Sequence, residues 1–336
     1  MPQPVAASVN LQAPGRLHLG FLDPAGTLGR RYGSLGLAIE GFESRVSIGT
    51  AARNEVNAVG APAQTEVARA AEFLRLLQRH SGRAEPLALT LDAVLPAHAG
   101  FGSGTQLALA IGRAFACWHR LDVSTPLLAQ WLGRGKRSGI GIAGFEHGGL
   151  LLDGGPSADG TPAPLLARIP MPVAWRALVV QDATGHGLSG ADEAQAIAAL
   201  PPLPQALAAE ICHQALMRVL PGAASADFAA FASGVARIQN IMGEHFAPAQ
   251  HGSAYTSAAV ARLIGGVAQR EPGAATGQSS WGPTGFAIVA SQAAADALVA
   301  SLQAAELIAP GLEVRIVAAR NHGAVIVDRR EPVRGH

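Results

Sequence analysis

Apolar positions near the start of the chain alternate as they do in β-strands. Residues 7–19 and 35–48 show this pattern on either side of residues 23–33, whose glycines and turn residues interrupt regular structure. We therefore predict two strands joined by a loop that has a function.

Helical spacing begins after residue 64. Apolar side chains recur three and four positions apart over residues 64–80, and residues 87–91 form a short apolar run typical of a buried strand. Ser124, followed two positions later by a proline, predicts a capped helix that continues through Trp131. The first half of the chain therefore mixes strands and helices.

Residues 157–172 divide the chain, because they are rich in proline, alanine and glycine and show little periodicity. We expect an N-terminal domain over residues 1–160 and a C-terminal domain over residues 170–336. Beyond the boundary the pattern predicts a strand at 177–181, helices at 191–200, 203–220, 228–242 and 254–269, and then strand, helix, strand and strand up to residue 327. The predicted fold class is α+β, without internal repeats.

Charge is nearly balanced, with 25 basic and 24 acidic residues in a chain of 336. Such a protein has no strong field for nucleic acid or for an anionic membrane, so neither is an expected partner. Lys136 is the single lysine. Recognition of phosphate must therefore depend mainly on arginine, whose guanidinium group can bind two oxygens at once.

The two cysteines, Cys117 and Cys212, lie far apart within apolar helical patterns, and no Cys-x-x-Cys spacing occurs. We expect them to be core residues of a protein in a reducing compartment. The N-terminal residues show no basic segment followed by an apolar stretch, and no apolar run approaches membrane-spanning length. These features predict a cytoplasmic protein.

The most informative segment is a glycine-rich loop at residues 96–106, which leads into the apolar stretch 107–116. Glycines let several backbone N–H groups face one ligand, and the first turn of a helix adds the positive end of its dipole, so the loop favours phosphate. It has neither the lysine of a Walker loop nor the spacing of a Rossmann fingerprint. The alternative is a glycine-rich turn before a core helix.

The side chains on this loop have more than one role open to them. Ser103 and Thr105 either cap the helix or bind phosphate or Mg²⁺, and both roles can coexist. Gln106, in the first helical turn, either reaches the ligand or faces water. His98 lies on the same loop.

Arg16 and His18 are one residue apart in a predicted strand, so their side chains share a face. On a solvent-exposed face this pairing would have no functional meaning. Arg30 and Arg31 stand among glycines in the neighbouring loop, an arrangement that suits a mobile clamp for an anion.

Two further segments contain candidate ligand contacts. Residues 133–149 are rich in glycine and basic residues and include Glu146 and His147, a polar pair that belongs either to a site or to the surface. Residues 277–285 place Trp281 among serine, glycine and proline, where it either flanks a planar ligand or seals a domain interface.

The pattern Pro-x-x-x-Gly-Phe-Gly-Ser at residues 96–103 resembles the phosphate loop of the GHMP small-molecule kinases. In many of these kinases a later motif reads Ser-Gly-x-Asp, and its aspartate is the catalytic carboxylate. Ser138 and Gly139 align with that motif and place Gly141 where the aspartate stands. Because a glycine cannot accept a proton, the resemblance implies a retained diphosphate site without the kinase carboxylate.

Six strings together are similar to one branch of that superfamily, the β-ribofuranosylaminobenzene 5′-phosphate synthases. They are GRLHLGF (15–21), GRRYGSLG (29–36), GFGSGTQL (100–107), RSGIGIA (137–143), QSSWGPT (278–284) and NHGA (321–324). The resemblance implies a GHMP-kinase-like two-domain fold, with an N-terminal domain like domain 2 of ribosomal protein S5 and a C-terminal ferredoxin-like α/β sandwich. A homodimer is expected by the same analogy.

The resemblance also implies a reaction in tetrahydromethanopterin biosynthesis. Phosphoribosyl pyrophosphate and 4-aminobenzoate, or 4-hydroxybenzoate, give a C-ribosyl aryl product, CO₂ and pyrophosphate. This is a pentosyl transfer with decarboxylation, with Mg²⁺ as the expected cofactor and without ATP. The sequence does not choose between the two benzoates.

The resemblance assigns roles to residues as follows. The diphosphate is bound by the backbone of Gly100, Gly102 and Gly104 with Ser103 and Thr105, the 5-phosphate or the carboxylate is bound by Arg16, Arg30 and Arg31, and Arg137 serves either anion. Ser34 and Gln106 are further substrate contacts, and Arg16 and Glu146 are expected to be catalytic. Proton transfer falls to His18 or His98, the metal to Ser103, Glu146 or Asp153, and the wall beside the aromatic ring to Trp281.

Two other functions compete with this interpretation. One is an ATP-dependent GHMP kinase in which Glu146 or Asp153 replaces the missing carboxylate. The other is a regulator that binds a phosphorylated metabolite without catalysis.

Overall fold

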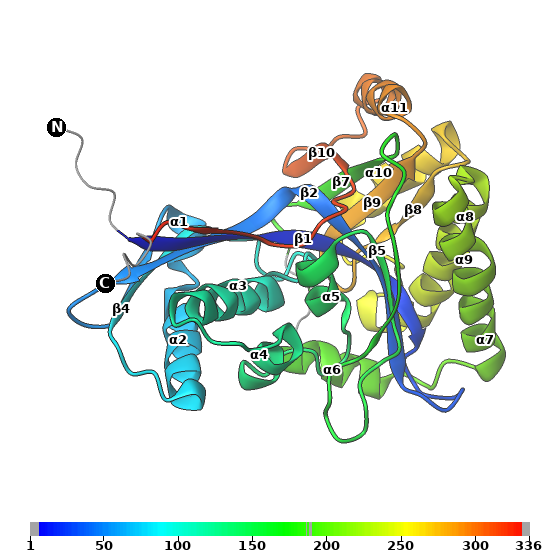
Figure 1. Ribbon diagram of the computed structural model, residues 1–336. Coiled ribbons are helices and arrows are strands. Elements are labelled where there is room, and N and C mark those ends of the chain that lie inside the picture. Colours follow the sequence, from blue (N-terminus) through cyan, green and yellow to red (C-terminus); the bar gives the residue numbers. More distant parts are fainter. Residues whose placement is uncertain (1–6, 186, 188–189, 331–336) are drawn as a thin grey trace.

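The computed structural model describes residues 7–185, 187 and 190–330. Two long antiparallel strands, β1 (Ser8–Asp23) and β2 (Tyr32–Thr50), run through the molecule and pair up to the tip of their hairpin (Figure 1). The predicted strand pair is confirmed, and both strands are longer than the alternation indicated.

Five further strands complete the first sheet, in the order β11-β1-β2-β4-β3, with β5 pairing β2 and β6 pairing β5. Their bounds are β3 (Glu55–Ala58), β4 (Leu87–Ala93), β5 (Leu150–Asp153), β6 (Leu165–Ile169) and β11 (Val325–Asp328). We expected little regular structure over residues 157–172, but β6 lies there, because its backbone completes the edge of β5. The alternation within β6 is too short to stand out in the sequence.

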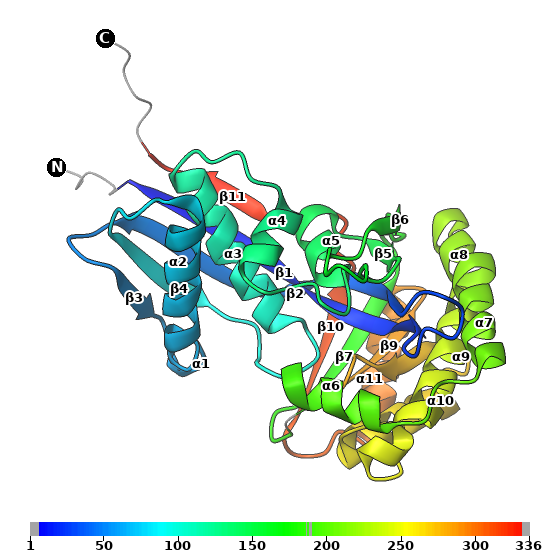
Figure 2. The same ribbon diagram turned by 90° about the horizontal axis from the view of Figure 1, so that it is seen from below.

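One face of this sheet is covered by helices (Figure 2). They are α1 (Ala61–Gln64), α2 (Val67–Ser81), α3 (Ser103–Trp118), α4 (Thr125–Trp131) and α5 (Ile140–His147). Alternate strand residues such as Leu89 and Leu91 pack against Leu74 of α2 and Ile111 of α3 in one buried cluster. The predicted cap is present, since the Ser124 side chain accepts a hydrogen bond from the backbone of Leu127.

The second sheet is antiparallel, in the order β10-β7-β9-β8. Its strands are β7 (Arg176–Asp182), β8 (Ala275–Gln278), β9 (Thr284–Val289) and β10 (Leu312–Ala318). The strand pattern predicted β7, β9 and β10, whereas β8 was missed because four residues that include a glycine show no clear alternation.

Helices cover both faces of this second sheet. α9 (Phe228–Phe246) lies on one face, and α10 (Ala258–Arg270) and α11 (Gln292–Ala304) lie on the other. The other helical segments of this half are α6 (Gly190–Ala199), α7 (Gln205–Gln214), a π-helical turn (Ala215–Val219), α8 (Leu220–Ser225) and a short 3₁₀ turn (Ala247–Gln250). Leu178 and Val180 of β7 pack with α10 and α11, whereas Val179 packs with Phe231 and Val235 of α9. The sheet is therefore buried on both sides, as its nearly continuous apolar strands require.

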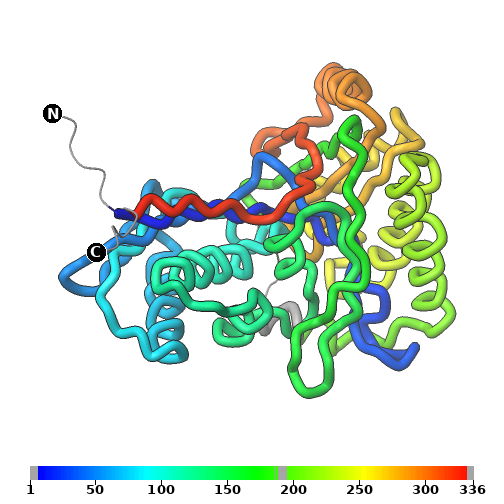
Figure 3. The backbone as a smooth tube through the Cα atoms, viewed as in Figure 1, coloured from blue at the N-terminus to red at the C-terminus, as the bar shows by residue number. Residues whose placement is uncertain are grey.

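The end of the chain returns to the first sheet, where β11 pairs antiparallel with β1 (Figure 3). The second sheet lies entirely within residues 170–336, but the first sheet takes β6 and β11 from beyond residue 160. Between the sheets, the side chain of Asn321 exchanges hydrogen bonds with the backbone of Met171 (2.8 and 2.9 Å). In addition, the backbone N–H of Gly149 donates to the carbonyl of Arg320 (2.7 Å).

Within the part of the chain that the structure describes, no helix is both long enough and apolar enough to cross a bilayer.

Candidate active site

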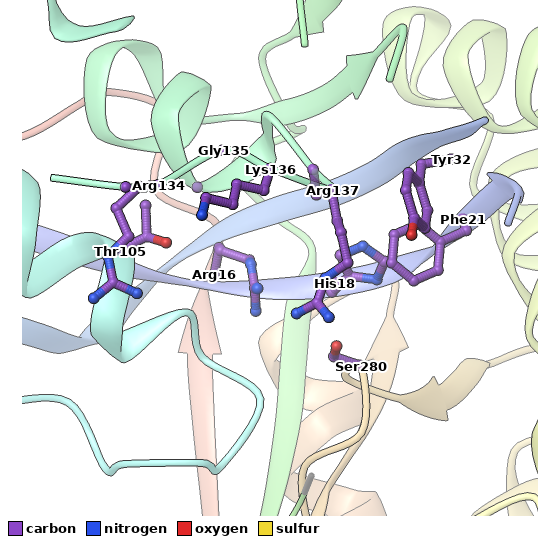
Figure 4. Close-up of a pocket in the computed structure, with 13 residues that line it drawn as sticks. Arg16, His18, Phe21, Tyr32, Thr105, Arg134, Gly135, Lys136, Arg137 and Ser280 are labelled. Atoms are coloured by element: carbon purple, nitrogen blue, oxygen red, sulfur yellow. The ribbon is translucent and has the colours of Figure 1, made fainter. Parts of the chain in front are cut away.

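A cavity of about 580 Å³ lies where β1, the start of α3 and the residues between α4 and α5 meet (Figure 4). A second cavity of about 300 Å³ adjoins it, since Arg16, Arg134 and Arg137 line both. The strand residues reach it because the β1–β2 ladder shifts register on either side of the segment 16–18. Such bulges turn side chains away from their regular positions in a sheet.

The predicted phosphate loop borders the second cavity and ends at the start of α3. Gly102, the N-cap, has φ +76°, and no side chain caps this helix end. Gly100 has φ +89°, and a Cβ there would lie 2.3 Å from the carbonyl oxygen of Ser279. In the first turn the backbone N–H of Thr105 donates to the carbonyl of Gly102 (3.0 Å), whereas those of Ser103 and Gly104 are the groups that an anion in the cavity would use.

Arg16 and Ser279 hold this loop in place. The Arg16 guanidinium and the Ser279 hydroxyl (2.8 Å) both donate to the carbonyl of Gly100. The same Ser279 hydroxyl accepts from the backbone N–H of His18 at 2.9 Å. The string at 278–284 therefore joins β1 to the glycine loop, a role that the sequence did not indicate.

Positive charge dominates the lining of both cavities. Arg134, Lys136 and Arg137 come from the loop before α5, Arg16 comes from β1, and Arg69 of α2 lines the second cavity. Burial, and then the charge of Arg69, lowers the pKa of Arg134, which packs over the ring of Phe73 at 5.1 Å. No carboxylate is among the described residues that line the two cavities.

Of these cations, only Arg16 and Arg137 were predicted from the sequence to bind a substrate anion. Arg134 and Lys136 were visible as basic residues among glycines in the segment 133–149, which was the available signal. Arg69 gave no signal, because it lies on a helix whose pattern indicates only packing.

His18 faces the main cavity from β1, and Figure 4 shows it between Arg137 and Phe21. Only 3% of it is exposed. Burial, and then the charges of Arg16 and Arg137, lowers the pKa of His18 from 6.5 to about 3. Its imidazole is therefore neutral at neutral pH. His98, the other proposed proton-transfer group, lines only the second cavity.

Gly141 of α5 lines the main cavity beside Thr105, at the position where the kinase pattern has its carboxylate. Gln106 lies under the same helix, fully buried, and donates to the carbonyl of Gly141 at 2.7 Å. Both alternatives for Gln106 were therefore wrong: it contacts neither the cavity nor water, but fixes α5 against α3.

Arg30, Arg31 and Ser34 do not line the described cavities that contain Arg16. Arg30 donates to the carbonyl of Gly155, and Arg31 donates to that of Pro24. The carboxylate of Asp23 accepts four hydrogen bonds within residues 25–28 and so folds the hairpin tip back on itself. Ser34 is fully buried in β2, opposite β5.

The predicted metal ligands are not brought together either. Asp153 is buried and accepts from the backbone N–H groups of Gly139 and Gly155, both at 2.8 Å, so it fixes the turn before α5. Glu146 lies 3.7 Å from His147 and outside the cavity. Among the residues that the structure describes, no three His, Cys, Asp or Glu side chains are close enough to hold a metal ion.

Trp281 is a core residue, with 1% exposure and its ring 4.6 Å from that of Phe246. It nevertheless borders the second cavity and a small side pocket of the main one. The prediction that it lies beside the aromatic ring of the ligand therefore stays a prediction, and its burial against Phe246 of α9 is the structural role that the sequence left open.

Comparisons with known proteins agree with this geometry. Residues 67–149 match the model for the GHMP kinases N terminal domain. The chain is 33% identical over 297 residues to a beta-ribofuranosylphenol 5′-phosphate synthase of Archaeoglobus fulgidus, covering 85% of this chain and 89% of that protein. It is 29% identical over 336 residues to a protein of the same name from Methanothermobacter thermautotrophicus, covering 94% and 98%.

Among solved structures, the phosphomevalonate kinase of Streptococcus pneumoniae has the same fold, with a TM-score of 0.68 at 12% identity, covering 94% of this chain and 100% of that one. The fold and the glycine loop thus define a protein of the GHMP kinase superfamily. Within that superfamily, the chain belongs to the family of the beta-ribofuranosylphenol 5′-phosphate synthases.

Proposed function

We propose that this protein transfers the ribosyl 5-phosphate of phosphoribosyl pyrophosphate to the ring carbon of 4-hydroxybenzoate or 4-aminobenzoate that bears the carboxylate. CO₂ and pyrophosphate are the other products, in the tetrahydromethanopterin pathway that the family resemblance implies. The observation that supports this most is a cavity lined by cations and an uncapped helix N-terminus, with Gly141 in place of a kinase carboxylate.

The charges suit the substrates. Phosphoribosyl pyrophosphate has a diphosphate at one end and a monophosphate at the other, and the benzoate adds a carboxylate. Arg16, Arg134, Lys136, Arg137 and Arg69 supply matching cations around the two joined cavities. The diphosphate is assigned to the start of α3 in the second cavity, and the sugar and the aromatic acid to the larger one.

The chemistry needs no strong base. The anomeric C–O bond breaks and pyrophosphate leaves with the electron pair. The ring carbon then forms a C–C bond to the sugar, and the bond to the carboxylate breaks, which releases CO₂ and returns its electrons to the ring. No proton is gained or lost, so a neutral His18 and a glycine at position 141 are compatible with every step. Stabilisation of the leaving pyrophosphate is the main demand on the protein.

Magnesium remains part of the proposal, but the carboxylates first assigned to it do not fit. Mg²⁺ in nucleotide-type sites is usually held by one or two carboxylates together with substrate phosphates. Of the predicted ligands only the Ser103 hydroxyl lines a cavity, so the ion would be held chiefly by diphosphate oxygens.

One assay tests the proposal. The protein is incubated with phosphoribosyl pyrophosphate, Mg²⁺ and either benzoate labelled at its carboxyl carbon, and the labelled CO₂ and the pyrophosphate are measured. Release of both in equal amounts is the expected result. Consumption of ATP with a small alcohol, and no release of CO₂, would instead identify a kinase.

A further inference from the structure

A small pocket adjoins the main cavity. It has a volume of about 30 Å³, and His18, Phe21 and Ser280 line both spaces. Its remaining wall is largely apolar and includes Met242, Phe246 and Trp281. A space of this size accommodates about one water molecule or one substituent of similar size, but not an aromatic ring.

Two buried polar atoms belong to the side chains that line this pocket and have no hydrogen-bond partner. They are Nε2 of His18, a residue 3% exposed, and Nε1 of Trp281, a residue 1% exposed. Buried polar atoms are nearly always bonded, and one that is not suggests an absent partner. The two residues are far apart in the sequence, and the fold brings both side chains to this one pocket.

The side-chain amides of Gln239 and Gln278, which also line the pocket, already have hydrogen-bond partners. Gln239 donates to the carbonyl of Leu19 and accepts from the backbone of Gln278. The side chain of Gln278 donates to Gln250 and to the carbonyl of Ser280 and accepts from Thr256. These bonds engage the side chains of Gln239 and Gln278, so His18 and Trp281 are the described side chains of this pocket that have a buried polar atom without a partner.

We propose that this pocket binds the para substituent of the aromatic acid and that His18 and Trp281 determine which substituent is accepted. The proposal rests on the proposed function. The ring then lies in the main cavity near Phe21 and Tyr32, with its carboxylate directed back toward the arginines. A para hydroxyl accepts a hydrogen bond from Trp281 Nε1–H and donates one to His18 Nε2.

The same geometry favours a hydroxyl over an amine. An indole N–H is only a donor. The amine of 4-aminobenzoate has its lone pair delocalised into the ring, so it presents donors to the Trp281 N–H and leaves that group unbonded. The low pKa of His18 is consistent with an imidazole that stays an acceptor at neutral pH. The relatives are named beta-ribofuranosylphenol 5′-phosphate synthases, and a phenol product agrees with a hydroxylated acceptor.

Binding can be measured by titration calorimetry on the full chain, with inorganic pyrophosphate present to occupy the anion site. The ligands are the 4-hydroxy, 4-amino, 4-fluoro and 4-methoxy benzoates. Fluorine is close to a hydroxyl in size but donates no hydrogen bond, and a methoxy group is larger and donates none either. On the unmodified protein we expect 4-hydroxybenzoate to bind about tenfold to a hundredfold more tightly than each of the others.

The substitution Trp281→Phe removes the N–H and keeps an aromatic ring. We expect it to lower the affinity for 4-hydroxybenzoate about tenfold and to change the affinity for 4-fluorobenzoate by less than about twofold. Trp175→Phe is the matched control, because Trp175 is equally buried but packs against Phe228 and Phe231 away from the cavity. It should change neither affinity.

Two results would overturn the assignment of the pocket. One is equal affinity of the unmodified protein for the hydroxy and fluoro ligands, a test that does not depend on the folding of any variant. The other is an equal loss of both affinities in Trp281→Phe. If no benzoate binds at all, the proposed function itself fails, and that outcome is distinct from binding without para selectivity.

Discussion

Gly141 of α5 and Thr105 of α3 lie so close that a Cβ at Gly141 would be 3.0 Å from Cγ2 of Thr105. Both residues line the main cavity. A side chain at position 141 would therefore project into the space between the start of α3 and the loop that contains Arg137. The contact makes position 141 a direct test of whether the cavity needs a carboxylate or must lack one.

Gly141→Asp should weaken the binding of phosphoribosyl pyrophosphate and should not create kinase activity. A new negative charge beside the cavity cations repels the diphosphate, and we expect KM to rise about tenfold relative to Gly141→Asn. Gly141→Asn has nearly the same size, so it separates charge from the steric contact with Thr105. Phosphorylation of any alcohol by Gly141→Asp, or an unchanged KM, would contradict the proposed role of the cavity.

Arg137→Met should raise the KM for phosphoribosyl pyrophosphate about tenfold to a hundredfold, because charge-assisted hydrogen bonds to phosphate are the strongest kind available here. Arg137→Lys should restore part of the loss. Arg30→Met is the control, since Arg30 lies against Gly155 and Ser157 and outside the cavity. Steady-state kinetics at two salt concentrations would measure the change, and an equal loss in Arg30→Met would show that the hairpin tip closes over the substrate.

The sequence alone predicted the parts of the candidate site that depend on local backbone conformation. The glycine loop is one example, because positive φ at Gly100 and Gly102 and the uncapped start of α3 follow from residues close together in the chain. The strand segment with Arg16 and His18 is another, since alternation alone places both side chains on one face. The missing kinase carboxylate at Gly141 was also visible as a pattern.

Contacts between segments that are far apart in the chain could not be predicted from the sequence. Gln106 bonds to a carbonyl 35 positions away, and Trp281 is buried by α9. Arg31 is turned away from the cavity by a fold of the hairpin tip that depends on the Asp23 carboxylate. Each of these side chains has the chemistry of a ligand contact. Only the tertiary arrangement shows that Gln106 and Arg31 bond within the protein and that Trp281 is a core residue that also lines the small pocket.

Asp153→Asn tests whether this residue supports the turn before α5 or holds the metal. Its carboxylate accepts from two backbone N–H groups, so an amide NH₂ must face at least one donor. We expect a loss of about 1–3 kcal/mol in the free energy of unfolding, measured in urea. The Mg²⁺ concentration for half-maximal activity should not change. A large increase in that concentration would indicate that Asp153 binds the metal after all.

Gly148→Ala should destabilise the junction between the two sheets. Gly148 has φ +63°, and a Cβ there would lie 2.4 Å from the carbonyl oxygen of His322. Strain and overlap together should cost about 3 kcal/mol or more in urea unfolding. Gly133→Ala is the control, because its φ of +66° is similar but nothing lies within 4 Å, and it should cost only about 1 kcal/mol. Equal losses in the two variants would show that the contact with residue 322 has no effect.

His18 should make the folded protein sensitive to acid. Its pKa of about 3 in the folded state lies below 6.5, so between these values the unfolded chain binds the proton more readily than the folded one. The contribution of His18 to stability is therefore complete above pH 6.5 and decreases as the pH falls toward 3. Between pH 7 and pH 4.5 the loss should be on the order of 2 kcal/mol.

The substitution His18→Gln removes this titration while keeping a polar side chain, so the urea midpoint of the variant should fall less steeply with pH than that of the unmodified protein. His147→Gln is the control, because the His147 side chain is 48% exposed and gains no burial on folding comparable to that of His18. The comparison uses the slope of stability against pH and not its absolute value, since the variant changes the core as well. Parallel slopes in the unmodified protein and His18→Gln would mean that His18 binds a proton as readily in the folded as in the unfolded state, and the lowered pKa of the buried imidazole would then be wrong.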